Sequence, residues 1–320
     1  MKLTVYHTDA KKKTSTKLIY LSKLAFAKHM AISGQSFLPM PHKIMRTLGM
    51  FLHYNLYTRN FTKKSSRFSE PPTIFSDPTE KGHFSNLAGK AIADYLSKRL
   101  DNSALTLTYE AAMKVVDKDY RGPRPDLIAF DLARRQTFTI EAKGYSGNCG
   151  NMLEHKKQAS SGSPKIVVNF SVAAVSFHIY DSIKTNYCDP ILDNSSINEE
   201  MLRELSKQYY SGLLSFIEND NNSTIINVNG TDYFKVNLIP TSLIRKSKID
   251  TILDPYSSLL SMPTLQNFSL ILPANIYQLA SVGMSVGNSI QAENHVPQYV
   301  DTPGLYIDND GVGLSYNRLV

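Results

Sequence analysis

The stretch TFTIEAK, residues 137–143, decides the fold expected for this chain, because it alternates like a β-strand and ends in two charged side chains. With the two-residue period of a strand, Glu141 and Lys143 point to one face, whereas Phe138 and Ile140 point to the other. One face of the strand is therefore expected to pack in an apolar core. The other face presents a carboxylate beside an ammonium group.

A second strand-like segment, residues 126–131, precedes this stretch, and residues 132–136 connect the two. If the two segments pair as an antiparallel hairpin, Asp126 lies opposite Glu141 or Ala142. The hairpin therefore predicts that two carboxylates and the lysine converge at its open end.

Two carboxylates at one strand end repel each other and raise a pKa unless a cation lies between them. Mg²⁺ suits such a pair because it prefers oxygen ligands and keeps several waters, and Mn²⁺ is an alternative. A divalent ion there polarises a phosphate, supplies an activated water and stabilises the leaving oxygen. Lys143 is then placed to orient or deprotonate the water, or to neutralise charge on the transition state. The pattern thus favours metal-dependent hydrolysis of phosphodiester bonds.

The surrounding segments predict an α/β fold in which helices pack on a mixed sheet. A helix is expected to begin after Asp77, which can cap it, with Pro78 in the first position and Glu80 three residues after the cap. The other predicted elements are a strand at 105–109, a helix at about 152–159 and one or two buried strands within 165–180.

The N-terminal 70 residues are expected to be helical and basic, with an amphipathic helix within 18–30 and apolar residues at helical spacing in 44–57. Residues 1–160 hold 26 Lys and Arg against 13 Asp and Glu, a net charge of +13, and residues 161–320 hold 9 against 15, a net charge of −6. A basic half of this size favours binding to DNA phosphates, with salt-sensitive affinity.

A break is expected near Cys188-Asp189-Pro190, followed by an α+β region. Ser196-x-x-Glu199 is a capping box for a helix that runs to about residue 217. Residues 224–228 and 231–238 then read as a hairpin on a two-residue Asn-Gly turn. Residues 255–292 carry no charge and are interpreted as buried structure or as a neutral contact surface. No chemistry is assigned after Pro240.

Pro125-Asp126, fourteen intervening residues and Glu141-Ala142-Lys143 together resemble the PD-(D/E)xK signature of restriction-endonuclease-like nucleases, over about residues 75–185. The resemblance implies that Asp126, Glu141 and the Ala142 carbonyl hold the metal and that Lys143 activates the water. Family members often carry a Glu on the preceding helix, which Glu80 matches in position. Some also have a polar residue on the helix after the lysine, which Gln158 matches.

Each of the peripheral candidates also has a structural interpretation. Glu80 is equally suited to a capping box with the residue at the helix start. Gln158 is a solvated helix residue in the alternative view, and Lys156 and Lys157 either contact DNA phosphates or form a wet helix face. No metal-binding spacing supports His155, which is therefore expected on the surface or in packing.

The sequence thus predicts a basic helical segment (1–70), a restriction-endonuclease-like core (71–190) and an α+β region for partner or oligomer contact (191–320). The expected activity is a DNA endonuclease, and fold-level analogy favours an effector nuclease of a bacterial anti-phage system with a sensor or regulatory partner. The alternatives are a stand-alone type II restriction endonuclease, which a dimer cutting a defined sequence would favour, and a non-catalytic nucleic-acid-binding or assembly subunit. Two cysteines and the lack of a secretory signal or membrane span predict a cytoplasmic protein.

Overall fold

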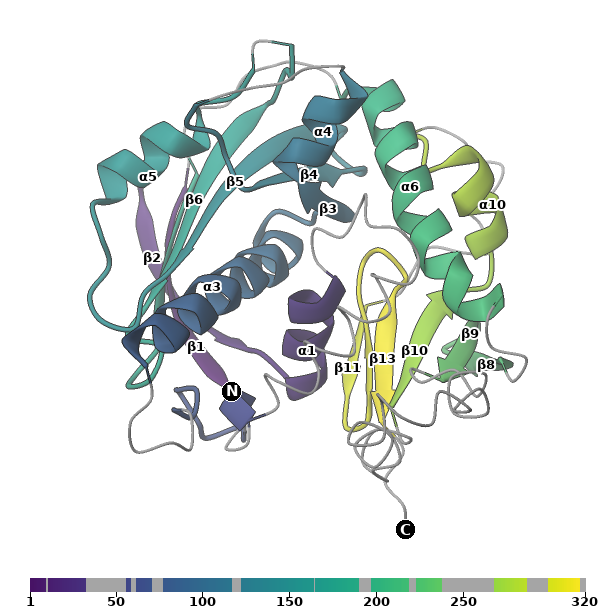
Figure 1. Cartoon of the computed structure of the whole chain (residues 1–320), viewed down its shortest axis with the longest axis horizontal. Helices are drawn as coiled ribbons and strands as arrows, with labels where there is room; N and C mark the ends of the chain where they lie inside the picture. The colour runs from purple at the N-terminus through teal and green to yellow at the C-terminus, as the bar shows by residue number, and fades with distance from the viewer. Residues whose placement is uncertain are drawn as a thin grey trace, which may run out of the picture.

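A computed structural model describes residues 1–9, 11–32, 56–58, 62–70, 77–116, 122–163, 165–189, 197–218, 223–237, 268–286 and 299–316. Within these residues the chain forms a seven-stranded and a six-stranded sheet, with helices packed around both (Figure 1). The strands of the first sheet are β1 (Lys2–Thr8), β2 (Thr14–Tyr20), β3 (Leu105–Thr108), β4 (Leu127–Asp131), β5 (Gln136–Gly144), β6 (Phe170–Phe177) and β7 (Lys184–Cys188).

The seven-stranded sheet is mixed, with the strand order β2-β1-β7-β6-β5-β4-β3. β3, β4 and β5 form an antiparallel meander, and β6 lies parallel to β5. β7 is antiparallel to β6 and parallel to β1, and β2 closes the edge as an antiparallel partner of β1. The predicted α/β class is therefore confirmed.

The two faces of this sheet carry different helices. α3 (Pro78–Leu100) packs on the face that holds Leu127 and Ile140, in one apolar cluster with them. α5 (Met152–Ala159) contacts β5 and β6, and Thr139 Oγ1 donates a hydrogen bond to its last carbonyl oxygen at 2.8 Å. Because Thr139 and Glu141 share a strand face, α5 lies on the side of the sheet to which Glu141 points.

α3 crosses β5 so closely that only glycine fits at the crossing. A Cβ atom on Gly89 would lie 2.5 Å from the carbonyl group of Lys143, and one on Gly144 would lie 1.8 Å from the Ser85 carbonyl oxygen. The two backbones therefore touch directly beside the end of β5. This contact fixes the position of the Lys143 backbone at the end of β5 relative to α3.

We expect Gly89→Ala to destabilise the protein by about 1–3 kcal/mol, because the added methyl group meets backbone that cannot turn aside. The matched control is Gly82→Ala on the same helix, where no atom of the described residues lies within 4 Å of the new Cβ atom. That change is expected to be neutral or to stabilise by up to about 1 kcal/mol, since alanine favours helix. Urea unfolding of the two variants measures the difference, and equal stabilities would contradict the close crossing.

The prediction of a helical N-terminus is wrong for the first 20 residues, which form β1 and β2 at the edge of the sheet. In β1, Leu3 and Val5 are buried while the residues between them are half-buried, which is the alternation of a strand. Helix begins later, at α1 (Lys23–Ile32), which overlaps the helix predicted within 18–30 but buries Lys28 and His29 instead of exposing a polar face. Of residues 44–57 only the last two are described, at the start of a 3-10 turn, η1 (Leu56–Thr58); the rest lie outside the described residues.

The C-terminal half forms the predicted α+β region. Its sheet has the order β11-β12-β13-β10-β9-β8, with every pairing antiparallel. Its elements are α6 (Glu199–Glu218), β8 (Thr224–Val228), β9 (Thr231–Asn237), β10 (Phe268–Pro273), α10 (Ile276–Val282), β11 (Val300–Thr302), β12 (Leu305–Ile307) and β13 (Gly313–Tyr316).

The predicted hairpin between β8 and β9 is confirmed. Its turn residues Asn229 and Gly230 both have positive φ, 52° and 86°, as an Asn-Gly turn requires. At the start of α6, the side chain of Asn198 accepts a hydrogen bond from the Met201 backbone N–H at 3.0 Å. Ser196, the predicted cap, lies outside the described residues.

Within the uncharged stretch of residues 255–292, β10 is buried, whereas Tyr277 and Val282 of α10 are 51% and 53% exposed. β10 lies between β13 and β9, and Leu270, Ile271 and Leu272 have no exposed surface. A charge in such a central strand would have to be removed from water, which explains the apolar sequence. The alternative of a neutral contact surface is therefore wrong for β10, and the stretches 255–267 and 287–292 lie outside the described residues.

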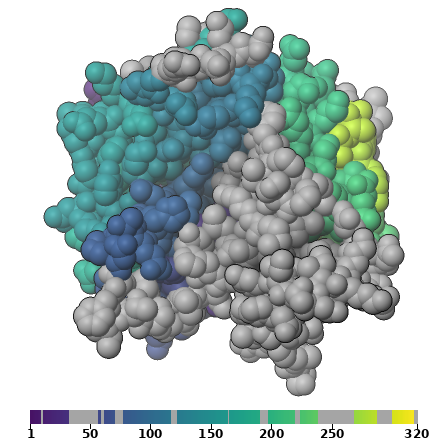
Figure 2. All heavy atoms as spheres, in the orientation of Figure 1, coloured from purple at the N-terminus to yellow at the C-terminus, as the bar shows by residue number. Residues whose placement is uncertain are grey.

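α6 joins the two sheets through one continuous apolar core. Met201 and Leu205 of this helix pack in the same cluster as Phe130 of β4 and as Leu270 and Leu314 of the second sheet. α4 (Tyr109–Val115) also packs against α6, and the two helices meet at the molecular surface (Figure 2).

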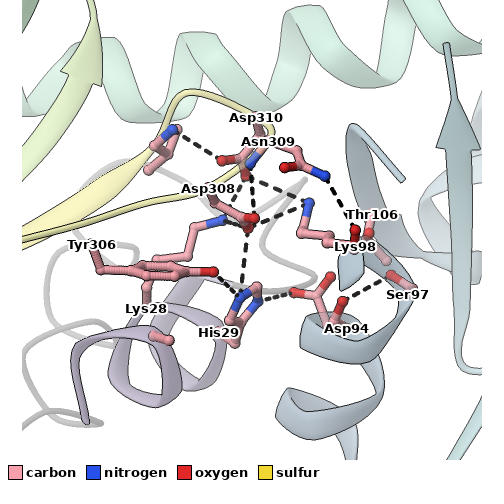
Figure 3. A network of polar contacts seen from close by, with 12 residues as sticks. Lys28, His29, Asp94, Ser97, Lys98, Thr106, Tyr306, Asp308, Asn309 and Asp310 are labelled. Carbon is pink, nitrogen blue, oxygen red and sulfur yellow. Dashed lines mark hydrogen bonds and ion pairs between the residues drawn. The ribbon is translucent and has the colours of Figure 1, made fainter. Parts of the chain in front are cut away.

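A buried network of charges makes a second connection between the sheets (Figure 3). Lys28 of α1 places its Nζ 2.7 Å from the carboxylates of both Asp308 and Asp310, which lie between β12 and β13. Lys98 of α3 lies 3.5 Å from Asp308. All four side chains are at most 3% exposed. The network therefore attaches the C-terminal sheet to α1 and α3.

The same network continues to α3 through a histidine. His29 Nδ1 lies 2.8 Å from Asp94 Oδ2, and its Nε2 lies 2.9 Å from the Tyr306 hydroxyl. Burial raises the pKa of Asp94, but the interactions with His29, Lys98 and Lys28 outweigh burial and lower this pKa to about 2. Asp94 therefore stays ionised inside the core.

Among the described residues no helix has both the length and the apolarity to cross a bilayer. Cys149 and Cys188 are free thiols.

Candidate active site

The β4–β5 register places the predicted acidic residues at one end of the hairpin. Leu127 pairs with Ile140, so the next step along both strands brings Asp126 across from Glu141. The backbone N–H of Asp126 donates to the Ile140 carbonyl at 3.0 Å, and the Ala142 N–H donates to Asp126 Oδ2 at 3.0 Å. The Asp126 carboxylate is thus held against the end of β5 by the backbone.

Lys143 contacts both carboxylates. Its Nζ lies 3.4 Å from Asp126 Oδ2 and 2.5 Å from Glu141 Oε1. The Asp126 and Lys143 side chains are 32% and 27% exposed, whereas Glu141 has no exposed surface. The predicted convergence of these three residues is therefore present, with Glu141 beneath two groups that solvent can reach.

Glu141 is electrostatically unsatisfied. Burial, and then the negative charge of Asp126, raise its pKa to about 7. Its Oε2 is buried and accepts no hydrogen bond from the described residues. Burial lowers the pKa of Lys143, but Asp126 and Glu141 outweigh that effect and raise it. Two carboxylates face one ammonium group, so the negative charge of this site is only partly neutralised and a further cation would be favourable.

Glu80 is not joined to this pair. The described residues contain no group of three or more His, Cys, Asp or Glu side chains arranged to hold a metal ion. Glu80 is in the first turn of α3, on the other side of the sheet from Glu141, and its Oε1 accepts a hydrogen bond from the Tyr57 hydroxyl at 2.7 Å. The helix cap itself is confirmed, since Asp77 accepts from the Thr79 N–H at 2.9 Å.

Gln158 supports the loop that leads to Asp126. Its Nε2 donates to the Arg124 carbonyl at 3.1 Å, so α5 and the loop before β4 are tied together. Lys156 and Lys157 lie in the last turn of α5, and their contact with phosphates stays a prediction. A role for the Ala142 carbonyl as a metal ligand also stays a prediction.

The sequence did not indicate that Tyr145 and His155 lie beside this site. The Tyr145 hydroxyl is 3.1 Å from His155 Nε2, and His155 is buried, as its packing interpretation expected. Burial and then the charge of Lys143 lower the pKa of His155, which keeps the ring neutral. The two-residue period of the strand could have predicted the position of Tyr145. Continued two residues beyond Lys143, it places Tyr145 on the same face of the sheet as Lys143.

Comparisons with known protein families, with characterised proteins and with solved structures give no match. The site combines a fully buried carboxylate, a second carboxylate open to solvent and a lysine in contact with both.

Proposed function

We propose that this chain is a metal-dependent endonuclease that hydrolyses the phosphodiester bonds of DNA. The observation that carries the proposal is the convergence of Asp126, Glu141 and Lys143 around a buried carboxylate whose Oε2 receives no hydrogen bond from the described residues. A protein gains little stability from such an arrangement, because a buried and incompletely paired charge is costly. A catalytic role explains why it is present.

The residues fit a divalent cation of the Mg²⁺ or Mn²⁺ type. Glu141 Oε2 and the Asp126 carboxylate offer the hard oxygen ligands that these ions prefer, and the Ala142 carbonyl is the third proposed ligand. A cation held there supplies Lewis-acid polarisation of the phosphate and a water of lowered pKa.

The protein's own groups then have distinct tasks. Lys143, which is partly exposed, is positioned to orient the attacking water and to neutralise negative charge that builds on the phosphate oxygens. The Ala142 N–H keeps Asp126 in place. Gln158 holds the loop before Asp126, so we assign it a positioning role without substrate contact.

The fold around the site supports the same proposal. α3, then β3 to β5, then α5 and then β6 follow the order of upstream helix, strands, following helix and buried strand that the PD-(D/E)xK resemblance implies. DNA as the substrate rests on the net charge of +13 that residues 1–160 carry, for which phosphates are the natural partner. An anti-phage setting with a regulatory partner stays a prediction from analogy.

Plasmid cleavage tests the proposal. The wild-type chain with Mg²⁺ is expected to nick supercoiled plasmid, and EDTA is expected to stop it. Asp126→Ala and Lys143→Ala are each expected to lower the rate at least about 100-fold. The control is Glu80→Gln, another carboxylate change, which is expected to leave the rate near wild type because Glu80 lies apart from the pair.

Equal nicking by wild type and both active-site variants, or none with either metal ion, would contradict the proposal. Discrete fragments from a dimeric protein would favour a type II restriction endonuclease instead of a non-specific nuclease. The non-catalytic alternative keeps one support, since the uncharged stretch combines a buried strand with exposed apolar side chains on α10.

A further inference from the structure

One face of the seven-stranded sheet is open where it reaches β1 and β2. The strand registers place four side chains in one row across β5, β6, β7 and β1, namely Lys143, Val175, Asn186 and Tyr6. They therefore share the face to which Glu141 points. α5 covers this face at β5 and β6, where Val175 is fully buried, whereas Asn186 and Tyr6 are only half-buried. Among the described helices, the cover of this face thus ends at β6.

The open face carries tyrosine rings that are not used within the fold. Tyr20 of β2 lies opposite Lys2, so its ring points to the same side as Tyr6. Tyr20 is 57% exposed, and Leu18 beside it on β2 is 55% exposed. Within the described residues, neither Tyr6 nor Tyr20 stacks on another ring or bonds through its hydroxyl. Exposed aromatic rings on a sheet are surfaces on which unpaired nucleic-acid bases stack.

The charges on this face are positive. Lys2 of β1 and Lys184 of β7 point to it, and neither makes an ion pair with a described residue. The sequences of β1, β2, β6 and β7 contain no acidic residue. A partner that covers this face is therefore expected to be negatively charged.

Exposed lysines lie at both ends of the open face. At one end, the Ser65 carbonyl accepts from the Lys2 N–H at 2.7 Å and the Ser66 carbonyl accepts from the Ile183 N–H at 2.8 Å, which holds residues 62–66 against β1 and β7. At the other end is the turn between β1 and β2. Against Asp9 and Asp181, the segments at the two ends carry the exposed residues Lys11, Lys12, Lys13, Lys63 and Lys64. Phosphates along a strand would meet positive charge over the whole length of the face.

We propose that this open face binds single-stranded DNA, with bases stacked on Tyr6 and Tyr20 and phosphates at Lys2 and Lys184. A single strand fits better than a duplex, because the bases of a duplex are already stacked on each other and cannot lie on the rings. The choice of DNA rests on the proposed function, but binding itself does not require cleavage.

The open face lies close to the candidate active site. Tyr6 and Lys143 are in one row, three strand spacings or about 14 Å apart. The loop after β5 lies between them, since Asn186 Nδ2 donates to Cys149 Sγ at 3.8 Å. A strand of several nucleotides is long enough to cross this distance, so one bound strand can reach both places.

Fluorescence anisotropy of the full chain in EDTA, with a labelled oligothymidine of about 15 nucleotides, tests the proposal. We expect a Kd below about 10 μM at moderate salt, and at least tenfold weaker binding of a duplex of equal length. Tyr6→Thr and Tyr20→Thr remove the rings but keep residues that favour strand, and each is expected to weaken binding at least about fivefold. Lys184→Gln is expected to lower the slope of log Kd against log salt by about 0.7, the value for one lost phosphate contact.

Two control variants are matched to these changes. Lys17→Gln removes a lysine from β2 on the opposite face, where Lys17 is engaged by His7, and is expected to bind within about twofold of wild type. Tyr277→Ala removes a ring that is 51% exposed on α10 and should also bind as wild type.

Equal or tighter binding of the duplex, tighter binding of oligouridine, or full binding by folded Tyr6→Thr and Tyr20→Thr variants would each overturn the proposal. Equal losses in Lys184→Gln and Lys17→Gln would overturn it as well, because general charge would then explain the affinity. Asp126→Ala is expected to bind oligothymidine as wild type does. Failure of plasmid cleavage would therefore leave the binding result unchanged, and the two proposals can fail separately.

Discussion

Lys28→Met is expected to lower the free energy of unfolding by about 3–5 kcal/mol, the largest stability loss that we expect from one substitution here. Methionine keeps the length of the side chain but removes the ammonium group that contacts Asp308 and Asp310 at 2.7 Å. Burial alone lowers the pKa of Lys28, but these two carboxylates reverse that effect and raise it. Without the lysine, two carboxylates stay buried with insufficient positive charge, which is the costly case.

Urea unfolding at neutral pH measures this loss. The matched control is Lys23→Met, because Lys23 is on the same helix but exposed, and its change is expected to stay within about 0.5 kcal/mol. Adding Asp308→Asn to Lys28→Met removes one of the unpaired charges, so the double variant is expected to lose less than the two single losses combined. Strict additivity, or a loss below about 1 kcal/mol for Lys28→Met, would show that the network contributes little to joining the sheets.

The meeting of Asp126 and Glu141 could be predicted because its geometry is local. Asp126 and Glu141 are joined by a short hairpin, and strand parity together with register is enough to place them opposite each other. The helix at α5 and the β8–β9 hairpin were predictable for the same reason, since caps, periodicity and an Asn-Gly turn act within a few residues.

The buried network could not be predicted because it depends on tertiary contacts. Lys28 and Asp308 are 280 positions apart in the sequence, and nothing near either residue shows that the two meet. A lysine or aspartate is normally read as a surface residue, so four such side chains in the core contradict the usual expectation. The two roles considered for Glu80 could not be separated for a related reason, since the sequence shows that it lies on a helix but not which face of the sheet the helix covers.

The N-terminal strands were mistaken for helix because lysines obscured a short alternation. Residues 11–13 are consecutive lysines that lie between β1 and β2, whereas the pattern of β1 depends on Leu3 and Val5 alone. β2 is almost fully exposed along its length, so it lacks the apolar face by which a strand is normally identified. Pairing with β1, and not its own composition, makes it a strand.

Glu141→Gln is expected to abolish metal-dependent cleavage and yet to stabilise the metal-free protein above neutral pH. The pKa of Glu141 is raised from its ordinary value to about 7, so the folded state holds a proton that the unfolded chain releases near pH 4.5. The wild-type protein therefore loses stability as the pH rises from about 4.5 through 7, by on the order of 2–3 kcal/mol from this group. Glutamine has no such charge, so the variant lacks this loss.

Thermal unfolding in EDTA at several pH values compares the two proteins. Asp101 and Asp189, whose pKa values are also raised, are present in both, so the difference in melting temperature reports on Glu141 alone. Above pH 7 the variant is expected to melt at the higher temperature, and near pH 4 the two should converge. Mg²⁺ is expected to stabilise wild type because a cation bound only by the folded state adds to its stability, whereas Glu141→Gln should respond weakly. Glu80→Gln is the control and should keep the full response to Mg²⁺. If Glu141→Gln proved less stable than wild type at pH 8 without metal, the contact with Lys143 would outweigh burial, and the carboxylate would be a structural ion pair instead of a metal ligand.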